Sequence, residues 1–192
     1  MIDVTPFEPM VFKVHYDGFD WKELEPICQR MIDETKQTAY EENENGKSSV
    51  WNNNQPHFNY AFHPFYEWIK PIAEDIIYNK WSYDKAYQFG IGNTWVNVHN
   101  KGGMTLEHNH GQAPLVMAAY LKMEAGNGYI EYKDPLEYIK SFRPKLSTIE
   151  EWKEIPAITG DVLLFPGWLR HRTQPNMLDS DRWVLTTNFA TR

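Results

Sequence analysis

The sequence has a single cysteine, Cys28, among its 192 residues. One cysteine excludes an intrachain disulfide and a cysteine zinc cage, and it suits a reducing compartment. The chain also lacks an apolar run of about 18 residues, the length that a membrane-spanning helix needs. Its first ten residues lack the basic start and apolar stretch of a secretion signal. We therefore expect a cytoplasmic protein without a membrane partner.

Basic side chains are also scarce, since 19 Lys and Arg residues stand against 26 Asp and Glu, a formal net charge of −7. Without a long Lys/Arg run, no nucleic-acid partner is expected. No internal repeat or linker divides the 192 residues, so a single domain with its own core is expected. Aromatic residues, by contrast, reach 15%, which favours strands and pocket walls and leaves room for a homodimer interface.

The first 85 residues combine one strand with two helices. Alternating side chains predict a strand over 10–16, and apolar residues at helical spacing predict a helix that begins after Asp20 as its N-cap. The polar tract 41–54 has the composition of a loop. A second helix is predicted over about 63–80, with a kink at Pro71 because proline lacks an amide donor.

After residue 85 the pattern changes to short strands separated by Gly, Asn and Pro turns. These strands are predicted over 86–100, 115–123, 129–133, 152–158, 161–165 and 182–190. One of the turns is expected at 101–103, whose sequence is KGG. Short and regularly spaced strands indicate a sandwich or barrel rather than a parallel sheet with crossover helices. The predicted fold is therefore mainly β, with N-terminal helices packed on a β-sandwich.

The histidines carry the clearest chemical signal. His108 and His110 stand two residues apart, so that on a strand both imidazoles would point to one face. A third histidine, His171, follows far along the chain, at the expected end of a buried strand. A close pair plus a distant histidine is a ligand pattern that suits a facial metal site with open positions. The alternative interpretation is that the pair lies in an exposed turn.

Arg182 opens an otherwise apolar strand, RWVLTTNF, where a charged residue is unexpected. If this arginine is interior, it needs an anionic partner, and its planar guanidinium suits a carboxylate held by two hydrogen bonds. If it lies at the strand end, it is solvated or paired with Asp179 or Asp181. The residues alone leave both interpretations open.

Four segments of the sequence resemble the iron(II)/2-oxoglutarate-dependent oxygenases: HNHGQAPLVMAAYLKM, YIEYKDP, GDVLLFPGWLRHRTQPN and RWVLTTNF. The closest likeness is to oxygenases of bacteriophage genomes, and prolyl-hydroxylase-like enzymes are more distant. The resemblance covers about residues 86–192 and implies that this part forms a double-stranded β-helix, or jelly roll. Residues 1–85 would then supply an N-terminal strand and helical support. For a phage-encoded protein, the expected location is the host cytoplasm.

The resemblance also implies roles for individual residues. His108 matches the first metal ligand of the family and His171 the distal one, and we expect His110 to complete the metal site. Fe(II) and the cosubstrate 2-oxoglutarate are the implied cofactors. Three positions match residues on the far carboxylate of 2-oxoglutarate, and a fourth matches a polar cosubstrate contact: Arg182, Tyr120, Thr186 and Asn97. The three histidines and the arginine form the predicted catalytic set.

One position departs from the family pattern. The usual motif is His-x-Asp or His-x-Glu, whereas here the second position is His110. Three neutral imidazoles leave a divalent ion with its full charge, which makes zinc and copper stronger competitors for the site. Glu107 could substitute as a carboxylate ligand, but on a regular strand its side chain would face away from that of His108.

The resemblance implies a dioxygenase that hydroxylates a peptide or small-molecule substrate and releases succinate and CO2. Two alternatives stay open at this point. One is a three-histidine cupin-type dioxygenase or zinc enzyme, in which the basic residue would bind substrate. The other is a catalytically silent jelly-roll binding module. The segments 41–57 and 133–150 are expected at the mouth of the pocket, and neither identifies the substrate.

Overall fold

The computed structural model describes residues 11–35, 43–135 and 152–191. Its main element is an antiparallel six-stranded sheet in the order β1-β7-β4-β9-β3-β2. In that order the strands are β1 (Phe12–His15), β7 (Asp161–Phe165), β4 (Val116–Lys122), β9 (Arg182–Thr191), β3 (Phe89–Thr105) and β2 (Asn43–Ser48). A smaller antiparallel sheet contains β6 (Trp152–Ile155), β5 (Ile130–Lys133) and β8 (His171–Thr173) in that order.

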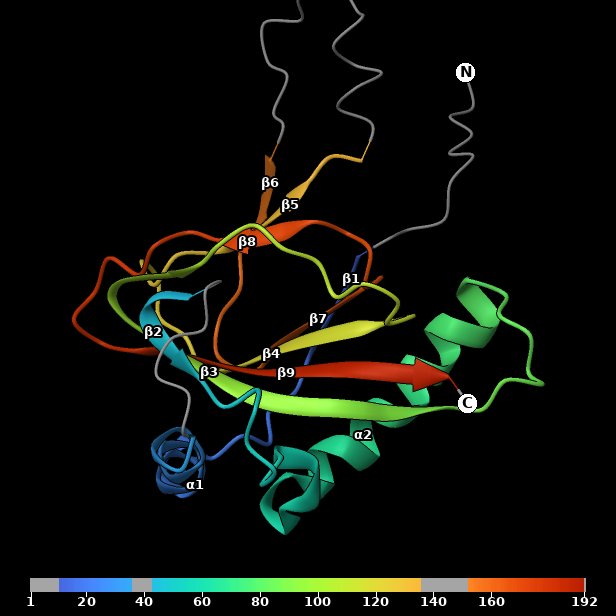
Figure 1. Ribbon diagram of the computed structural model, residues 1–192, viewed down its shortest axis with the longest axis horizontal. Coiled ribbons are helices and arrows are strands. Elements are labelled where there is room, and N and C mark those ends of the chain that lie inside the picture. The colour runs from blue at the N-terminus through green and yellow to red at the C-terminus, as the bar shows by residue number, and fades with distance from the viewer. Residues whose placement is uncertain (1–10, 36–42, 136–151, 192) are drawn as a thin grey trace, which may run out of the picture.

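The large sheet is covered on both faces. The helices lie on one side and the small sheet lies on the other (Figure 1). Every residue of β7 and nearly every residue of β4 is therefore buried, instead of alternating between buried and exposed. One apolar cluster joins the helices to the sheet, and a second lies between the two sheets. The predicted mainly-β jelly roll with N-terminal helices is confirmed.

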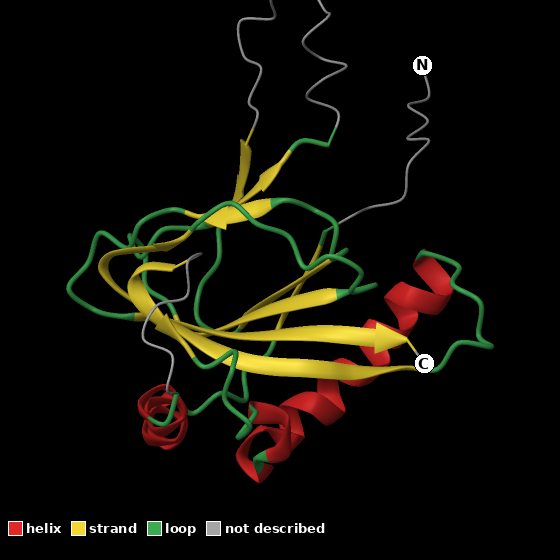
Figure 2. Cartoon of the chain, viewed as in Figure 1, coloured by secondary structure: helices red, strands yellow, loops and turns green. Residues whose placement is uncertain are grey.

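The two predicted helices are present, and both lie against the same face of the large sheet (Figure 2). In α1 (Trp21–Asp33), the Asp20 side chain caps the first turn by accepting a hydrogen bond from the amide of Lys22. The second helix, α2 (His63–Asp75), follows two short 3-10 turns, η1 (Pro56–Phe58) and η2 (Tyr60–Phe62). It runs past Pro71 and widens into a π-helical turn, η3 (Ile76–Lys80). No helix in these described ranges has the length and apolar character to cross a bilayer.

Two local predictions are wrong. Residues 43–48, part of the tract predicted as a loop, form the edge strand β2. Hydrogen bonding to β3 satisfies the backbone groups of this segment, and this outweighs the low strand propensity of its polar residues. The KGG sequence does not end a strand. Instead β3 continues through it to Thr105, with Gly102 at a φ of 78° and a shift in the β2–β3 register nearby. The short strand β8 was not predicted.

Candidate metal and cosubstrate site

The three histidines of the predicted metal site come together, although not in the way the spacing suggested. His171 is the first residue of β8. His108 lies beyond the end of β3 and forms an isolated β-bridge with His171, through two backbone N–H···O bonds of 3.0 Å. The amide of His110 donates to the carbonyl of Gly167 at 2.8 Å. The pair is therefore positioned by backbone pairing with the segment around His171, and the prediction that it stands on a regular strand is wrong.

Hydrogen bonds to the backbone orient two of the imidazole rings. Nδ1 of His108 lies 2.8 Å from the carbonyl oxygen of Leu106, and Nδ1 of His171 lies 2.8 Å from that of Leu169. A carbonyl oxygen only accepts, so each Nδ1 carries the proton and donates it. Each Nε2 then holds a free lone pair, the form of imidazole that binds a metal ion.

The ring nitrogens converge on a common point. One ligand nitrogen from each of His108, His110 and His171 lies within 4.8 Å of the other two. The Nε2 atoms of His110 and His171 are 3.3 Å apart. Nitrogens bound at right angles to one ion at about 2.1 Å would be about 3 Å apart. The donor set therefore fits a divalent metal ion of the kind that imidazole prefers.

Burial keeps two of the three imidazoles neutral. Burial, helped by the neighbouring His108, lowers the pKa of His110 to about 3. Burial likewise holds the pKa of His171 well below its ordinary value, again helped by the other two histidines. Phe165 packs edge-on against His171 with ring centroids 4.8 Å apart, which helps to exclude water. Both imidazoles are thus unprotonated at neutral pH, as metal binding requires.

Among the described residues, no carboxylate joins the three histidines. The Glu107 side chain instead pairs with Arg170, at 2.5 Å, and with Lys133, at 3.6 Å. These ion pairs engage Glu107 outside the cluster of three histidines. A divalent ion bound by the three imidazoles would keep its full double charge at this site.

The histidines face a cavity of about 260 Å³. Three of the residues predicted to bind the cosubstrate line it: Asn97 of β3, Tyr120 of β4 and Thr186 of β9. The remaining walls combine apolar side chains with further polar ones. They include Trp51, Trp95, Ala118, Ile130, Phe165, Val184, Asn93, His99, Thr105, Asn109, Thr173 and Asn188.

Arg182, the fourth predicted residue, is interior, with 1% of its surface exposed. The alternative partners are engaged elsewhere, since Asp179 pairs with Lys101 at 2.9 Å and Asp181 accepts from Asn100 at 2.8 Å. One Nη of Arg182 donates to three backbone carbonyls, those of Asn127, Gly128 and Gln174, at 2.5, 2.7 and 3.1 Å.

The guanidinium has no anionic partner within the described ranges. Its other Nη donates to Thr173 Oγ1 at 2.9 Å, and its Nε is buried without a hydrogen-bond partner. Burial lowers the pKa of Arg182 to about 10, which leaves the group charged at neutral pH. A buried cation with an unused donor is suited to receiving an anion.

The predicted cosubstrate residues are spread along the cavity. Tyr120 lies close enough to Arg182 for the arginine charge to act on its hydroxyl: burial raises the pKa of Tyr120 to about 12, and the positive charge opposes that rise. Thr186 lies four residues beyond Arg182 on β9, which corresponds to about 13 Å along a strand. The hydroxyl oxygen of Thr186 accepts a hydrogen bond from the side-chain Nδ2 of Asn97 at 3.2 Å. The structure therefore separates Thr186 from Arg182 along β9, whereas Asn97 pairs with Val184, between the two.

Sequence reasoning missed the hydroxyl groups at the Arg182 end of the cavity. Thr173 stands two residues after His171 on β8, so both side chains face the same side of the strand. That spacing was a usable signal, but it could be interpreted only once β8 itself was recognised. Thr105, the last residue of β3, and His99, earlier on the same strand, also line the cavity, and Thr105 Oγ1 lies 2.8 Å from His99 Nε2.

Comparisons with known proteins agree on one family. Residues 93–188, half of the chain, match the family model described as "Putative 2OG-Fe(II) oxygenase". The fold is similar to that of HygX from Streptomyces hygroscopicus solved with nickel, 2-oxoglutarate and hygromycin B. The identity is 12% and the TM-score 0.64, covering 94% of this chain and 82% of HygX.

A prolyl-4-hydroxylase from Pseudomonas putida is also similar, at 13% identity and a TM-score of 0.62, covering 95% of this chain and 92% of that protein. The carbocyclase SnoK from nogalamycin biosynthesis, described as α-ketoglutarate-dependent, has 12% identity and a TM-score of 0.62, with 95% and 79% covered. At these identities the likeness establishes the jelly-roll fold. No curated protein matches the chain in sequence.

Proposed function

Since the chain belongs to the 2OG-Fe(II) oxygenase family, we propose that His108, His110 and His171 hold its iron and that 2-oxoglutarate extends from them toward Arg182. The chain is thus an Fe(II)- and 2-oxoglutarate-dependent oxidoreductase. The assignment of residues rests on one observation above all. Three imidazole nitrogens converge on one point at a cavity that Thr173 also lines. Thr173 accepts a hydrogen bond from Arg182, a buried cation that has no anionic partner among the described residues.

When bound, Fe(II) supplies the activation of oxygen that couples oxidation of 2-oxoglutarate to succinate and CO2 with oxidation of the substrate. The protein's own residues bind and orient the reactants. The three imidazoles would hold the ion from one side, which would leave its other side for ligands. The carbonyls of Leu106 and Leu169 fix the rings of His108 and His171, so little reorganisation is needed on binding.

At the other end of the cavity, the positive charge of Arg182 favours the far carboxylate of 2-oxoglutarate. The Tyr120 hydroxyl stays protonated, because burial raises its pKa to about 12, and it can donate to the same group. Asn97 and Thr186, which are bonded to each other, lie along the cavity wall where the cosubstrate would extend. Apolar side chains such as Phe165 and Val184 exclude water from the space between the two ends.

We propose a small molecule or a peptide as the substrate. Trp51 lines the cavity while 62% of its surface is exposed, which suits a contact at the entrance. Asn109, also exposed, lines the cavity between the two histidines of the close pair. An aromatic face and a carboxamide that line one cavity can bind either a ring or a peptide unit.

The test is thermal melting of metal-stripped protein, repeated with Mn(II) under nitrogen and then with 2-oxoglutarate added. A ligand at about 100 times its Kd adds about 2.7 kcal/mol of stability, which for a chain of this size raises the Tm by about 5–10 °C. We expect the keto acid to stabilise the protein only when the metal is present. Stabilisation by the metal but not by the keto acid would favour the cupin-type or zinc alternative, and no response to either would favour a silent module.

A further inference from the structure

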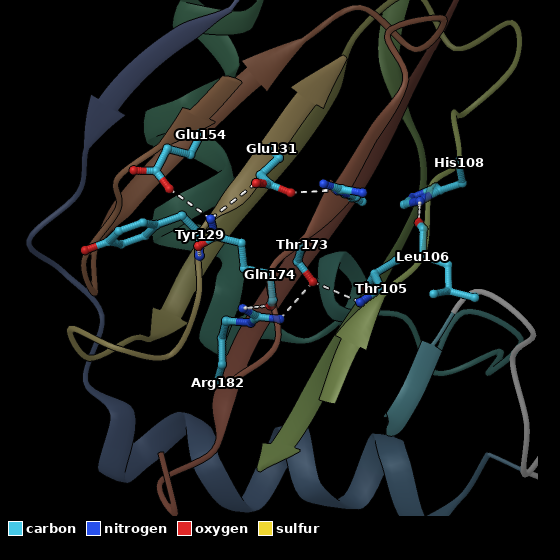
Figure 3. A network of polar contacts seen from close by, with 10 residues as sticks. Thr105, Leu106, His108, Tyr129, Glu131, Glu154, Thr173, Gln174 and Arg182 are labelled. Carbon is cyan, nitrogen blue, oxygen red and sulfur yellow. Dashed lines mark hydrogen bonds and ion pairs between the residues drawn. The ribbon is translucent and has the colours of Figure 1, made fainter. Parts of the chain in front are cut away.

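The cavity face of β3 and β9 is a ladder of directly opposed side chains. Every second residue of each strand points to this face, because side chains alternate along a strand. The opposed pairs are His99 with Arg182, Asn97 with Val184, Trp95 with Thr186 and Asn93 with Asn188. Arg182, which donates to Thr173 as Figure 3 shows, marks one end of the ladder. Asn93 and Asn188 form the other end, about 20 Å away along the strands.

The asparagine pair lies at the metal end of the cavity. Asn93 and Asn188 both line the cavity, and the ring of Trp95 on the next rung is 5.9 Å from that of His110. Asn188 also adjoins His110, since burial lowers the pKa of that imidazole and the Asn188 carboxamide opposes the change. 2-Oxoglutarate would extend from the metal toward Arg182. The asparagine pair, at the opposite end of the ladder, therefore stays open to a substrate.

One oxygen of this pair has no donor. Oδ1 of Asn188 is buried, and no described residue forms a hydrogen bond to it. A carboxamide oxygen carries two lone pairs, so a position for a ligand remains even where the His110 ring occupies one. Burying an oxygen without a donor costs free energy, which a ligand that donates to it recovers. The oxygen therefore favours a substrate with an N–H or O–H group.

The walls of the cavity carry no fixed charge. No Lys, Arg, Asp or Glu belongs to the described side chains that line it. Burial lowers the pKa of three lining histidines, His99, His110 and His171, which keeps them neutral. A charged group that left water for the asparagine end would meet no opposite charge from the protein, and a bound metal ion would repel an ammonium. The donor that fits Asn188 is therefore uncharged.

An amide group offers both of the complements that the pair can bind. Opposed side chains of an antiparallel pair have Cβ atoms about 5 Å apart, so the carboxamides of Asn93 and Asn188 lie side by side. Each carboxamide can donate and accept. One can accept from an amide N–H while the other donates to the amide carbonyl. An ester lacks the donor, and an ammonium lacks the acceptor.

On the proposed function as a premise, we infer that Asn93 and Asn188 bind an uncharged amide group of the substrate. Asn188 accepts from the amide N–H and Asn93 donates to the amide carbonyl, which holds the carbon next to the amide at the metal. The two asparagines are thus specificity residues. They select an amide over a free amine or an ester of similar size.

The experiment uses three probes that share a phenyl ring: benzamide, methyl benzoate and benzylammonium. Protein loaded with Mn(II) and 2-oxoglutarate is titrated with each probe under nitrogen, and the proton relaxation of the probe is measured. Mn(II) speeds relaxation only in molecules bound close to it, and Zn(II)-loaded protein gives the background. We expect benzamide to bind at least about tenfold more tightly than the other two. Methyl benzoate leaves the Asn188 oxygen unpaired, and benzylammonium brings an uncompensated charge.

Substitutions of the pair test the assignment. Asn188→Leu and Asn93→Leu retain the size of the side chain without its polar group, and each should reduce the preference for benzamide to less than about threefold. Asn93→Asp adds a negative charge and should raise benzylammonium affinity at least about fivefold. Asn79→Leu is the control, because Asn79 lies on η3 and bonds Asp75 outside the cavity. It should retain the full preference.

Mn(II) affinity, 2-oxoglutarate affinity and Tm are measured for every variant. Should Asn188→Leu fail to fold, Asn188→Ala removes the same carboxamide. If the parent protein does not bind 2-oxoglutarate when Mn(II) is present, the proposed function fails and the inference fails with it. If the parent binds 2-oxoglutarate but binds no probe, or binds all three equally, the inference alone is overturned.

Two results from the variants would also overturn the inference. One is a preference for benzamide that survives both leucine variants. The other is a loss of Mn(II) affinity in Asn188→Leu with the preference retained, which would assign Asn188 to the support of His110 instead of the substrate.

Discussion

The two ends of the cavity are built in different ways. At the metal end, Nδ1 of His108 and of His171 each bonds a carbonyl two residues earlier in its own segment, and one β-bridge joins the two segments. At the Arg182 end, two segments far apart in the sequence hold the guanidinium. The carbonyl of Asn127 comes from the loop before β5, and the Thr173 hydroxyl and the Gln174 carbonyl come from the end of β8 and the residue after it. Local spacing is visible in a sequence, whereas contacts between distant segments depend on the fold. The metal end was therefore easier to predict from the sequence than the Arg182 end.

The largest effect is expected at the metal end. His171→Ala removes a ligand whose ring is already fixed by the backbone, so Mn(II) affinity should fall by more than about 100-fold. The measurement is calorimetric titration of stripped protein. His57→Ala is the control, because His57 bonds Thr94 and does not line the cavity. Equal Mn(II) affinity in the two variants would show that His171 is not a metal ligand.

The second largest effect is expected at the Arg182 end, on the binding of 2-oxoglutarate. Arg182→Ala deletes the positive charge at the carboxylate, and 2-oxoglutarate affinity should fall by about 30-fold or more, while Mn(II) affinity stays within about threefold. Isothermal titration with each ligand in turn measures both. Equal loss of both affinities, or loss of neither, would contradict the separate roles of the two ends.

A third variant sharpens the comparison by restoring the usual ligand pattern. His110→Asp would replace one neutral imidazole with a carboxylate, which would lower the net charge of the ion together with its three ligands by one. Carboxylate ligands suit harder ions, so the ratio of Mn(II) to Zn(II) affinity should rise severalfold. Competition titrations measure this ratio, with His110→Asn as the uncharged control. An unchanged ratio would mean that His110 is not a ligand.

The smallest effect concerns a carboxylate outside the cavity. The Asp161 side chain is 5% exposed, and it accepts from Lys13 at 2.7 Å, His15 at 2.8 Å and the amide of Ile158 at 3.0 Å. Burial acts to raise its pKa, but these hydrogen bonds outweigh burial and leave the pKa below its ordinary value. Asp161→Asn should therefore cost about 1–2 kcal/mol at pH 7.

The pH dependence of that effect has a definite sign. A carboxylate whose pKa is lowered by folding stabilises the protein above its unfolded pKa of about 3.9, and loses that contribution as the pH falls through the folded value. Thermal melts should therefore show the parent and Asp161→Asn converging below about pH 4. The affinities for Mn(II) and 2-oxoglutarate should be unchanged. A difference in Tm that persists undiminished at acid pH would contradict this account.

Much of the fold was predictable because it depends on local patterns. Apolar periodicity identified α1 and most of the strands, and Asp20 was identified as a cap by residue type and position. The edge strand β2 was not predictable, because its sequence NENGKS has no alternation and its pairing with β3 is a tertiary effect. Positions 136–150 of the predicted 133–150 insertion lie outside the described residues.

The candidate site was likewise predictable where local patterns determine it and not where it depends on contacts between distant segments. The proposed metal ligands followed from residue type, spacing and the resemblance to a family. The resemblance also identified Arg182, whose burial the sequence left open and the structure establishes. It did not identify Thr173, because the bond from Arg182 to Thr173 joins β9 to β8 and only the folded chain brings these strands together. Side chains that bond across distant strands cannot be paired from spacing alone.

The most direct test of the central claim is the visible spectrum of Fe(II)-loaded protein under nitrogen as 2-oxoglutarate is added. A 2-oxo acid that chelates Fe(II) produces a charge-transfer absorption band that neither component has alone. We predict this band for the parent protein, its loss in His171→Ala, and its appearance only at higher 2-oxoglutarate concentration in Arg182→Ala. A parent protein that binds Fe(II) and shows no band at saturating 2-oxoglutarate would contradict the account.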